Sequence, residues 1–537
     1  MNYDYIVVGA GSAGSVVAAR LSESGRYTVL LLEAGPSDHR FFVQMPLGYA
    51  KTYNDHLVNW CYHSLPNEGL GGRSVYVPRG KIMGGSSSIN ALVYVHGQPQ
   101  DYDGWAAAGN PGWAAADVLA AYRKLEMHPY GPSEFHGDSG PLGITDMAPR
   151  VHPLCEHYFA AAGELGIAKN LDYNGAIQEG VAPYQITARH GRRLSASRAY
   201  LWPAKRRVNL RIEMEAQATR LLFEGKRAVG VVYRQGDRDR TAKARREVIV
   251  ASGSINSPKL LQLSGIGPGE LLKDRGIEVL QESPAVGRNL QDHAGYDHYY
   301  VSKVPSMNED LRPRLSQIWI GFLYLMFSRG PLAMSGNHAG GFVRTRPNAG
   351  RPNMQLYFCP FSYEKVPEGS SALLLPDPFP GFSLSASPCR PTSRGTVSIK
   401  SADWRDAPLI DLNLLGTVDD VAEILEGARL IRRFAGTKAF QAITERERLP
   451  GPETKSDEQL IADIRARAYS IFHPCGTVKM GPDPKTSVVD ARLRVHGVEG
   501  LRVIDASIFP TIPSGNINGP SIMVGEKGAE MVLADAR

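Results

Sequence analysis

Cysteine is scarce in this chain: five cysteines are spread over 537 residues, and no two of them form a Cys-x-x-Cys motif. Their odd number and wide spacing favour neither a disulfide framework nor a zinc site, and we predict no metal centre. Cysteines without an expected disulfide are typical of a protein in a reducing compartment. The first residues run directly into an apolar stretch without a basic leader segment, so we expect a cytoplasmic protein.

Long hydrophobic runs and a strong charge of one sign are also missing. The longest apolar run, residues 318–327, is half of the roughly 20 residues that a membrane-spanning helix needs. We expect a buried helix or a lid there, with a peripheral membrane contact as the alternative. The 60 Lys and Arg against 54 Asp and Glu leave a net charge of +6, which excludes a charge-driven nucleic-acid-binding protein. The basic cluster at residues 234–246 is broken by two aspartates and is typical of a solvent-exposed hairpin.

The composition that remains is that of a folded protein with more than one domain. Hydrophobic residues make up 43% of the chain, and its length exceeds what a single core supports. The 56 glycines follow no collagen-like period, so we expect them in turns and cofactor loops.

The N-terminal segment carries the pattern of a dinucleotide-binding unit. An apolar run at residues 4–8 predicts a buried strand, and a glycine motif, a helical pattern and a second apolar run ending in Glu33 follow it. The glycines of this Gly-x-Gly-x-x-Gly motif are Gly9, Gly11 and Gly14. They permit a tight turn, a close approach of the backbone to a pyrophosphate and close helix–strand packing, while Glu33 can accept hydrogen bonds from a ribose.

The motif by itself leaves FAD and NAD open. An NAD enzyme would normally lack further Gly/Ser-rich cofactor loops, but this chain has several, at residues 80–90, 253–267, 473–481 and 501–520. The second of these loops follows an expected strand at residues 247–251. We predict that its helix begins with Ser257 as the N-cap and Pro258 as the first helical residue.

Together these segments resemble the glucose–methanol–choline (GMC) family of FAD-dependent alcohol oxidoreductases, and within it the bacterial alcohol, choline and sorbose dehydrogenases. The two signature stretches of the family are matched by residues 79–90 and 253–267. The resemblance implies a mixed α/β fold in which a Rossmann-like FAD-binding domain carries an inserted substrate domain with an antiparallel sheet. It assigns residues 1–155, 201–295 and 465–537 to the FAD-binding domain, and residues 156–200 and 296–464 to the substrate domain.

The resemblance also implies the cofactor, FAD, and the residues that bind it. Some members attach FAD covalently through a histidine just before the asparagine of the Gly-Gly-Ser-Ser-Ser loop, but Ile89 stands there in this chain, so we expect non-covalent binding. The cofactor-binding residues carried over are Gly9, Gly11, Ser12, Ala13, Gly14, Glu33, Ala34, Arg79, Gly84, Gly85, Ser86, Asn90, Ala91, Ala218, Gly253, Asp505, Ala506, Asn518 and Pro520.

Oxidising an alcohol requires a base for the hydroxyl proton and a hydride acceptor, which flavin N5 supplies; histidine suits the first role because its pKa lies near neutral pH. The resemblance assigns this base to His473, which opens the His-Pro-Cys-Gly-Thr-Val-Lys-Met-Gly segment. Asn516 matches the family's second site residue and is expected to hydrogen-bond the substrate oxygen. A turn residue is the alternative for Asn516.

Phe472 and Ile471 are expected to line the substrate pocket, and His338 is either a pocket residue or a structural histidine. Choline-oxidising members carry a glutamate just before an Ala-Gly-Gly-Phe turn, whereas Asn337 and His338 stand there in this chain, so choline is disfavoured unless an aromatic cage compensates. The likeness to the bacterial dehydrogenases implies a dehydrogenase that oxidises a primary alcohol to an aldehyde and passes electrons to a quinone. The alternatives are an oxidase that reduces O2 to H2O2, and a flavin-bound hydroxynitrile lyase.

Overall fold

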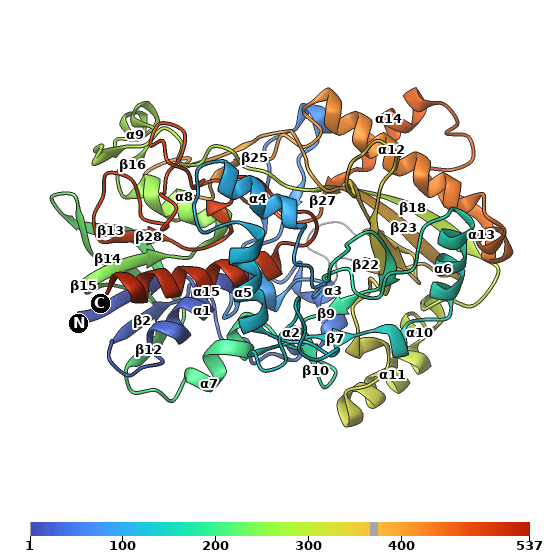
Figure 1. Cartoon of the computed structure of the whole chain (residues 1–537), viewed down its shortest axis with the longest axis horizontal. Helices are drawn as coiled ribbons and strands as arrows, with labels where there is room; N and C mark the ends of the chain where they lie inside the picture. The colour runs from blue at the N-terminus through green and yellow to red at the C-terminus, as the bar shows by residue number, and fades with distance from the viewer. Residues whose placement is uncertain (1, 366–373, 537) are drawn as a thin grey trace.

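The computed structural model describes residues 2–365 and 374–536, and these residues form two β-sheets that lie side by side (Figure 1). Helices cover both sheets. The α-helices are α1 (Ser12–Leu21), α2 (Phe41–Gln44), α3 (Tyr49–Thr52), α4 (Pro99–Ala107), α5 (Ala115–Leu125), α6 (Leu154–Glu164), α7 (Trp202–Ala204), α8 (Gly253–Leu263), α9 (Gly269–Asp274), α10 (Asn308–Leu311), α11 (Arg314–Phe327), α12 (Val418–Ala435), α13 (Lys438–Ile443), α14 (Asp457–Arg467) and α15 (Asn518–Asp535).

The first sheet has a parallel centre. Its strands are β1 (Asn2–Val8), β2 (Val29–Leu32), β12 (Leu210–Glu213), β13 (Ala216–Glu224), β14 (Arg227–Gln235), β15 (Arg238–Val250) and β28 (Leu501–Val503). They follow the order β12-β2-β1-β15-β14-β13, with β28 paired to β15. Strand β14 runs antiparallel to both of its neighbours, β13 and β15, and the other pairs are parallel. The chain thus returns to the N-terminal sheet at β28, close to its C-terminus. Because parallel strands end at the same edge, the loops after β1, β2, β15 and β28 all meet there.

Two helices from opposite ends of the chain pack together on this sheet, α1 and α15, which Figure 1 shows in blue and red next to each other. Their close approach depends on Gly525, where a Cβ atom would lie 2.9 Å from the Ala13 carbonyl oxygen. The first and last segments of the chain thus share one hydrophobic core. This core holds the edge at which the loops meet.

The second sheet is antiparallel. Its strands are β18 (Ala294–Ser302), β19 (Ala339–Val343), β20 (Met354–Cys359), β23 (Gly381–Pro388), β26 (Thr444–Leu449) and β27 (Tyr469–Ser470). They follow the order β19-β20-β23-β18-β26, and β27 pairs with the start of β18. Helices α6, α12 and α13 bury apolar side chains against it. With the first sheet, it confirms the predicted mixed α/β fold class.

Short strands complete the secondary structure. The pairs are β3 (Tyr62–His63) with β4 (Tyr76–Val77), β5 (Glu126–Met127) with β6 (Leu142–Gly143), β7 (Thr145–Asp146) with β9 (Gln185–Ile186), β10 (Ala188–Arg189) with β11 (Arg192–Arg193), β16 (Ile266–Gly267) with β17 (Gln281–Glu282), β21 (Tyr363–Lys365) with β22 (Leu374–Pro376), and β24 (Thr396–Ser398) with β25 (Leu409–Asp411). Strand β8 (Gly180–Pro183) lies beside β19. The basic cluster at residues 234–246, which we predicted to be a solvent-exposed hairpin, includes the exposed turn between β14 and β15.

The predicted start of helix α8 was wrong. The helix begins at Gly253, so Ser257 is not its N-cap and Pro258 lies inside it. Proline has no N–H to donate to the carbonyl of Ser254 one turn earlier. The Thr477 hydroxyl donates to that carbonyl oxygen instead, at 2.6 Å, and this contact lets the helix continue through the proline.

We predicted a buried helix or a lid at residues 318–327; the helix is confirmed, but its burial is not. The segment is helical, in α11, but among its large side chains only Ile320 and Tyr324 are buried, while most of the others face solvent. Among the described residues no helix is long and apolar enough to cross a membrane.

Candidate active site

A cavity of about 540 Å³ lies where the loops of the first sheet meet the second sheet. The loops that line it come from distant parts of the sequence. The predicted site residues found in its lining are Gly9, Gly11, Ser12, Ala13, Glu33, Ala34, Arg79, Gly85, Ser86, Asn90, Ala91, Ala218, Gly253, Ile471, Phe472, His473, Asp505, Ala506, Asn516 and Asn518. The predicted residues outside the lining are Gly14, Gly84, His338 and Pro520.

These exceptions have structural explanations. A Cβ atom at Gly14 would lie 1.9 Å from the Gly9 carbonyl oxygen, and Gly84 has a φ of +87°, so both glycines shape loops without facing the cavity. Pro520 is buried in the first turn of α15. His338 is also buried, and its Nδ1 accepts a hydrogen bond from the backbone N–H of His152 at 3.0 Å. The structure therefore favours the structural alternative for His338 and contradicts its assignment to the pocket.

The glycine loop after β1 and the Gly-Gly-Ser-Ser-Ser loop pack directly on each other. Gly9 has a φ of +104°, and a Cβ atom at Gly85 would come within 2.8 Å of the Gly11 Cα. No larger residue fits at either position without moving the opposing backbone. Ser12 at the start of α1 donates a hydrogen bond to the Asn518 side chain at the start of α15, at 2.8 Å. Two helix N-termini, which favour anionic groups, thus open onto the same cavity.

Glu33 lies at the carboxyl end of β2 and is buried. Its carboxylate accepts hydrogen bonds from the backbone N–H groups of Ala10 and Gly35, both at 2.9 Å. Burial nevertheless raises the pKa of Glu33 to about 7. A ribose diol that donates to the remaining lone pairs would stabilise the charged form and lower this pKa again.

Asp505 follows β28 and joins its own loop to the N-terminal half of α8. Its carboxylate accepts hydrogen bonds from the backbone N–H of Gly253 at 2.8 Å, the Ser257 hydroxyl at 2.6 Å and the backbone N–H of Ser507 at 2.8 Å. Burial raises the pKa of this carboxyl group. Because its oxygens are engaged with protein donors, Asp505 fixes the N-terminus of α8 at the wall of the cavity.

His473 follows a strained turn after β27. Phe472 has a φ of +70°, an unusual conformation for a bulky residue. The turn is held because the Asp292 carboxylate accepts the backbone N–H of His473 at 2.8 Å and the Ser470 hydroxyl at 2.5 Å. The Arg79 guanidinium donates to the Phe472 carbonyl oxygen at 2.6 Å. These contacts fix the backbone position of His473.

The ring of His473 is oriented by a second histidine. His293 Nε2 lies 2.9 Å from the carbonyl oxygen of Cys389, which can only accept, so this nitrogen carries the proton. Burial lowers the pKa of His293 to about 4, so the ring is neutral and its Nδ1 is an acceptor. This Nδ1 lies 3.1 Å from Nδ1 of His473, which must therefore be the donor. A neutral His473 then has its free lone pair on Nε2.

The Nε2 atom of His473 faces the cavity residue Asn516, whose Nδ2 lies 3.2 Å away. The orientation of the Asn516 amide is set by Gln355, whose Nε2 donates to Asn516 Oδ1 at 3.0 Å, and Tyr357 donates to Gln355 Oε1 at 2.8 Å. Burial, with the neighbouring His293 and Arg79, holds the pKa of His473 well below its usual range. His473 is therefore neutral at neutral pH and can accept a proton.

The sequence reasoning missed the residues that position this pair, namely Asp292, His293, Gln355 and Tyr357. The first two follow one another just before β18, in a polar stretch that gives no signal of their role. Gln355 and Tyr357 alternate along β20 and so face the same side of the second sheet. Only the fold places that side opposite the loop that carries His473.

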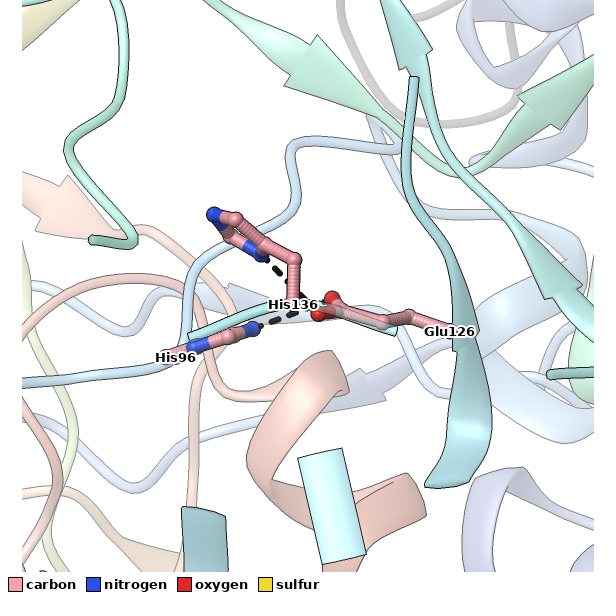
Figure 2. A group of neighbouring side chains, drawn as sticks. All are labelled: His96, Glu126 and His136. Atoms are coloured by element: carbon pink, nitrogen blue, oxygen red, sulfur yellow. Dashed lines mark hydrogen bonds and ion pairs between the residues drawn. The ribbon is translucent and has the colours of Figure 1, made fainter. Parts of the chain in front are cut away.

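A separate cluster of titratable side chains lies outside the cavity lining. Figure 2 shows His96 and His136 pointing to the Glu126 carboxylate; His136 Nδ1 lies 2.9 Å from Glu126 Oε1 and His96 Nε2 lies 3.2 Å from Glu126 Oε2. His136 Nε2 lies 3.0 Å from Asp172 Oδ1. Burial opposes the charged ring, but hydrogen bonds to Asp172 and Glu126 raise the pKa of His136 to about 9.

The atoms of His96, Glu126 and His136 are close enough to ligate one metal ion. However, both ring nitrogens of His136 lie at hydrogen-bond distance from carboxylates, and Tyr94 also donates to Glu126, at 2.8 Å. An imidazolium between two carboxylates satisfies this geometry with protons alone. The cluster is a buried ion-pair network.

The fold and the cavity define a class of protein: an oxidoreductase with a dinucleotide-binding unit, in which a histidine and an asparagine face the cofactor cavity. Family-wide sequence profiles described as GMC oxidoreductase match residues 3–295 and 391–525. The chain belongs to the GMC oxidoreductase family.

Individual proteins agree with this assignment over the full length. The chain is 42% identical to an oxygen-dependent choline dehydrogenase of Brucella anthropi, covering 99% of this chain and 96% of the relative. It is 40% identical to an alcohol dehydrogenase [acceptor] of Pseudomonas putida, with the same coverage. The structure is similar to pyridoxine 4-oxidase from "Mesorbium loti", with a TM-score of 0.88, 30% identity and 98% coverage of both chains.

The cofactor of this family is FAD, and the cavity fits it. The paired glycine loops leave room for a pyrophosphate, the helix N-termini favour its charge, and Glu33 presents a carboxylate where a ribose would lie. Ile89, at the position of covalent attachment in other members, carries no atom that could form such a bond. Non-covalent attachment remains a prediction.

Proposed function

We propose that this enzyme oxidises a primary alcohol to an aldehyde and passes the electrons to a quinone-type acceptor. The proposal rests on the hydrogen bonds of His473, whose Nδ1 contacts His293 and whose Nε2 contacts Asn516. This arrangement leaves Nε2 of His473 unprotonated and facing the cavity. When bound, FAD supplies the acceptor for the hydride of the alcohol carbon.

The roles of the residues follow from their atoms. Nε2 of His473 accepts the hydroxyl proton of the alcohol, since the Nδ1 proton is held by His293. The Asn516 Nδ2 group donates a hydrogen bond to the alcohol oxygen and keeps it near His473. Asn516 has no basic nitrogen, so His473 is the single base in this scheme.

The cavity favours a neutral substrate over a cationic one. Among the described residues, the carboxylates in its lining belong to Glu33 and Asp505, which both lie in cofactor loops. Tyr49, Tyr53 and Phe361 contribute aromatic surface, as expected of a site for aliphatic or benzylic alcohols. The names of the Brucella relatives support choline as a second candidate, and the aromatic side chains could receive its trimethylammonium group through cation–π contacts.

The test is to mix the purified FAD-loaded enzyme anaerobically with a panel of alcohols while following the absorbance band of oxidised flavin. Aliphatic or benzylic primary alcohols should bleach the band, His473→Ala should abolish bleaching, and His190→Ala, at an exposed histidine, should leave it intact. Bleaching by choline alone would favour the second candidate. A cyanohydrin cleaved without bleaching, with no alcohol active, would replace the proposal by the lyase alternative.

The acceptor is tested separately on the reduced enzyme. Rapid reoxidation by a soluble ubiquinone analogue and slow reoxidation by O2 would support the dehydrogenase. The reverse order, with stoichiometric H2O2, would identify an oxidase.

A further inference from the structure

Helix α11 presents an apolar face to solvent. Figure 1 shows the helix at the lower right edge of the molecule. The exposed large side chains include Leu315, Ile318, Trp319, Phe322, Leu325 and Met326, and Leu315 is 83% exposed. They recur every three or four residues, so they lie along one side of the helix. We call these six residues the α11 face.

The helix is anchored through its opposite side. Ile320 and Tyr324, four residues apart, are buried, and Tyr324 packs against Met45 and Ala333. The Phe41 ring in α2 lies 6.0 Å from the Tyr324 ring, and Phe41 and Phe42 are themselves exposed. Exposed apolar side chains of α2 thus lie next to the anchored side of α11. A protein surface this rich in large apolar side chains indicates an interaction site.

Arginines flank the α11 face at both ends, and the acidic residues Glu309 and Asp310 precede it in α10. No Asp or Glu occurs in the sequence between Asp310 and Glu364. Arg312 and Arg314 are exposed at the start of the helix and Arg329 just beyond its end. Arg192 is also exposed in the neighbouring hairpin, and its Nε lies 3.5 Å from the Ser328 hydroxyl.

We propose that the α11 face docks this enzyme on the surface of an anionic phospholipid bilayer. The helix has 14 residues and is therefore about 21 Å long, too short to span the hydrocarbon core but suited to lie along the interface. Its apolar side chains enter the acyl boundary, and the arginines at both ends contact lipid phosphates. A second copy of the chain fits less well, since a symmetric contact through this face would bring the two sets of arginines together.

The α11 face is connected to the cavity by a short stretch of chain. After α11 the chain forms a 3-10 helix at Pro331–Ala333 and reaches Asn337, which lines the cavity. Tyr49, which also lines the cavity, has its hydroxyl beside Gly336, and it follows the segment that carries Phe41 and Phe42. A membrane-dissolved alcohol or quinone would thus meet the enzyme on the side where these segments converge. The docking itself does not depend on the proposed reaction.

Flotation of the FAD-loaded enzyme with lipid vesicles tests the proposal. Vesicles of phosphatidylcholine with phosphatidylglycerol should bind the enzyme about tenfold more strongly than phosphatidylcholine alone, and added salt should weaken this difference. The triple variant Leu315→Gln, Ile318→Gln and Leu325→Gln should lose about tenfold or more of the binding. A matched control, Ile177→Gln with Val208→Gln and Val418→Gln, replaces exposed apolar residues elsewhere and should bind normally.

Two further readouts keep the outcome clear. The FAD content and thermal unfolding of the α11 triple variant should match those of the unmodified enzyme, because the changed side chains face solvent. Brominated lipids should quench tryptophan fluorescence in the unmodified enzyme but not in Trp319→Phe. Absence of binding to the anionic vesicles at low salt would overturn the proposal. So would a concentration-dependent dimer in sedimentation equilibrium that the triple variant abolishes, because the face would then be covered by a second copy.

Discussion

Two buried groups of histidines in this protein are held in opposite protonation states. His473 and His293 contact each other, a backbone carbonyl and an amide. No carboxylate of the residues that the structure describes hydrogen-bonds either ring, so burial lowers both pKa values. His136 lies between Glu126 and Asp172, and its pKa is raised. The partners of a buried histidine, rather than its burial, thus decide whether it can accept a proton or serves as a fixed cation.

Removing His473 should have the largest effect. Without a base at Nε2, His473→Ala should lower kcat/KM for the alcohol by about a thousandfold. The unfolding midpoint should change little, since the backbone of the turn is held by Asp292 and Arg79. Single-turnover bleaching of the flavin measures the first effect and thermal unfolding the second. A variant that retains a tenth of the rate would show that another group takes the proton.

Removing His136 should lower the free energy of unfolding and leave the rate of the reaction largely unchanged. His136→Ala leaves the buried Glu126 and the half-buried Asp172 without their shared cation and should lower the free energy of unfolding by about 3 kcal/mol. The folded pKa of about 9 lies above the usual value near 6.5, so this contribution is complete below about pH 6.5 and is lost as pH rises through 9. Urea unfolding at pH 6 and pH 10 should therefore give a large and a small difference from the unmodified enzyme. Equal differences at both pH values would contradict the ion-pair assignment.

Exchanging His293 tests whether it acts through His473. His293→Phe removes the acceptor of the Nδ1 proton and should lower kcat/KM about 10- to 100-fold by freeing the ring to turn. His293→Gln keeps an oxygen that can accept this proton and should recover most of the activity. FAD content should be normal in both variants. If glutamine and phenylalanine behave alike, the effect is one of packing and not of ring orientation.

The contrast between the two groups also marks the limit of what the sequence could predict. The glycine loops and His473 belong to contiguous motifs, whose chemistry is local, and most of the residues assigned to them line the cavity. Gln355, Tyr357 and His293 act through contacts between segments far apart in the chain, which no local pattern encodes. The start of α8 was misplaced for the same reason, because the partner of the Ser254 carbonyl is the distant Thr477. The apolar run of α11 predicted a helix, but whether it would be covered depended on the tertiary fold.

Replacing Asp172, the more exposed of the two carboxylates that contact His136, should have the smallest effect on stability. It also separates the contributions of Asp172 and Glu126 to the raised pKa of His136. The Asp172 side chain is 35% exposed, whereas that of Glu126 is fully buried, so Asp172→Asn should cost only about 1 kcal/mol at pH 7. The pKa of His136 should fall but stay above its usual value, because Glu126 and its hydrogen bond remain. NMR titration of the His136 ring measures this shift. The pKa of Asp172 is lowered by its contact with His136, so its contribution is present above the usual carboxyl range and is lost in acid, and the difference between variant and unmodified enzyme should vanish at low pH. A loss as large as that of His136→Ala would mean that Asp172, and not Glu126, holds the cation.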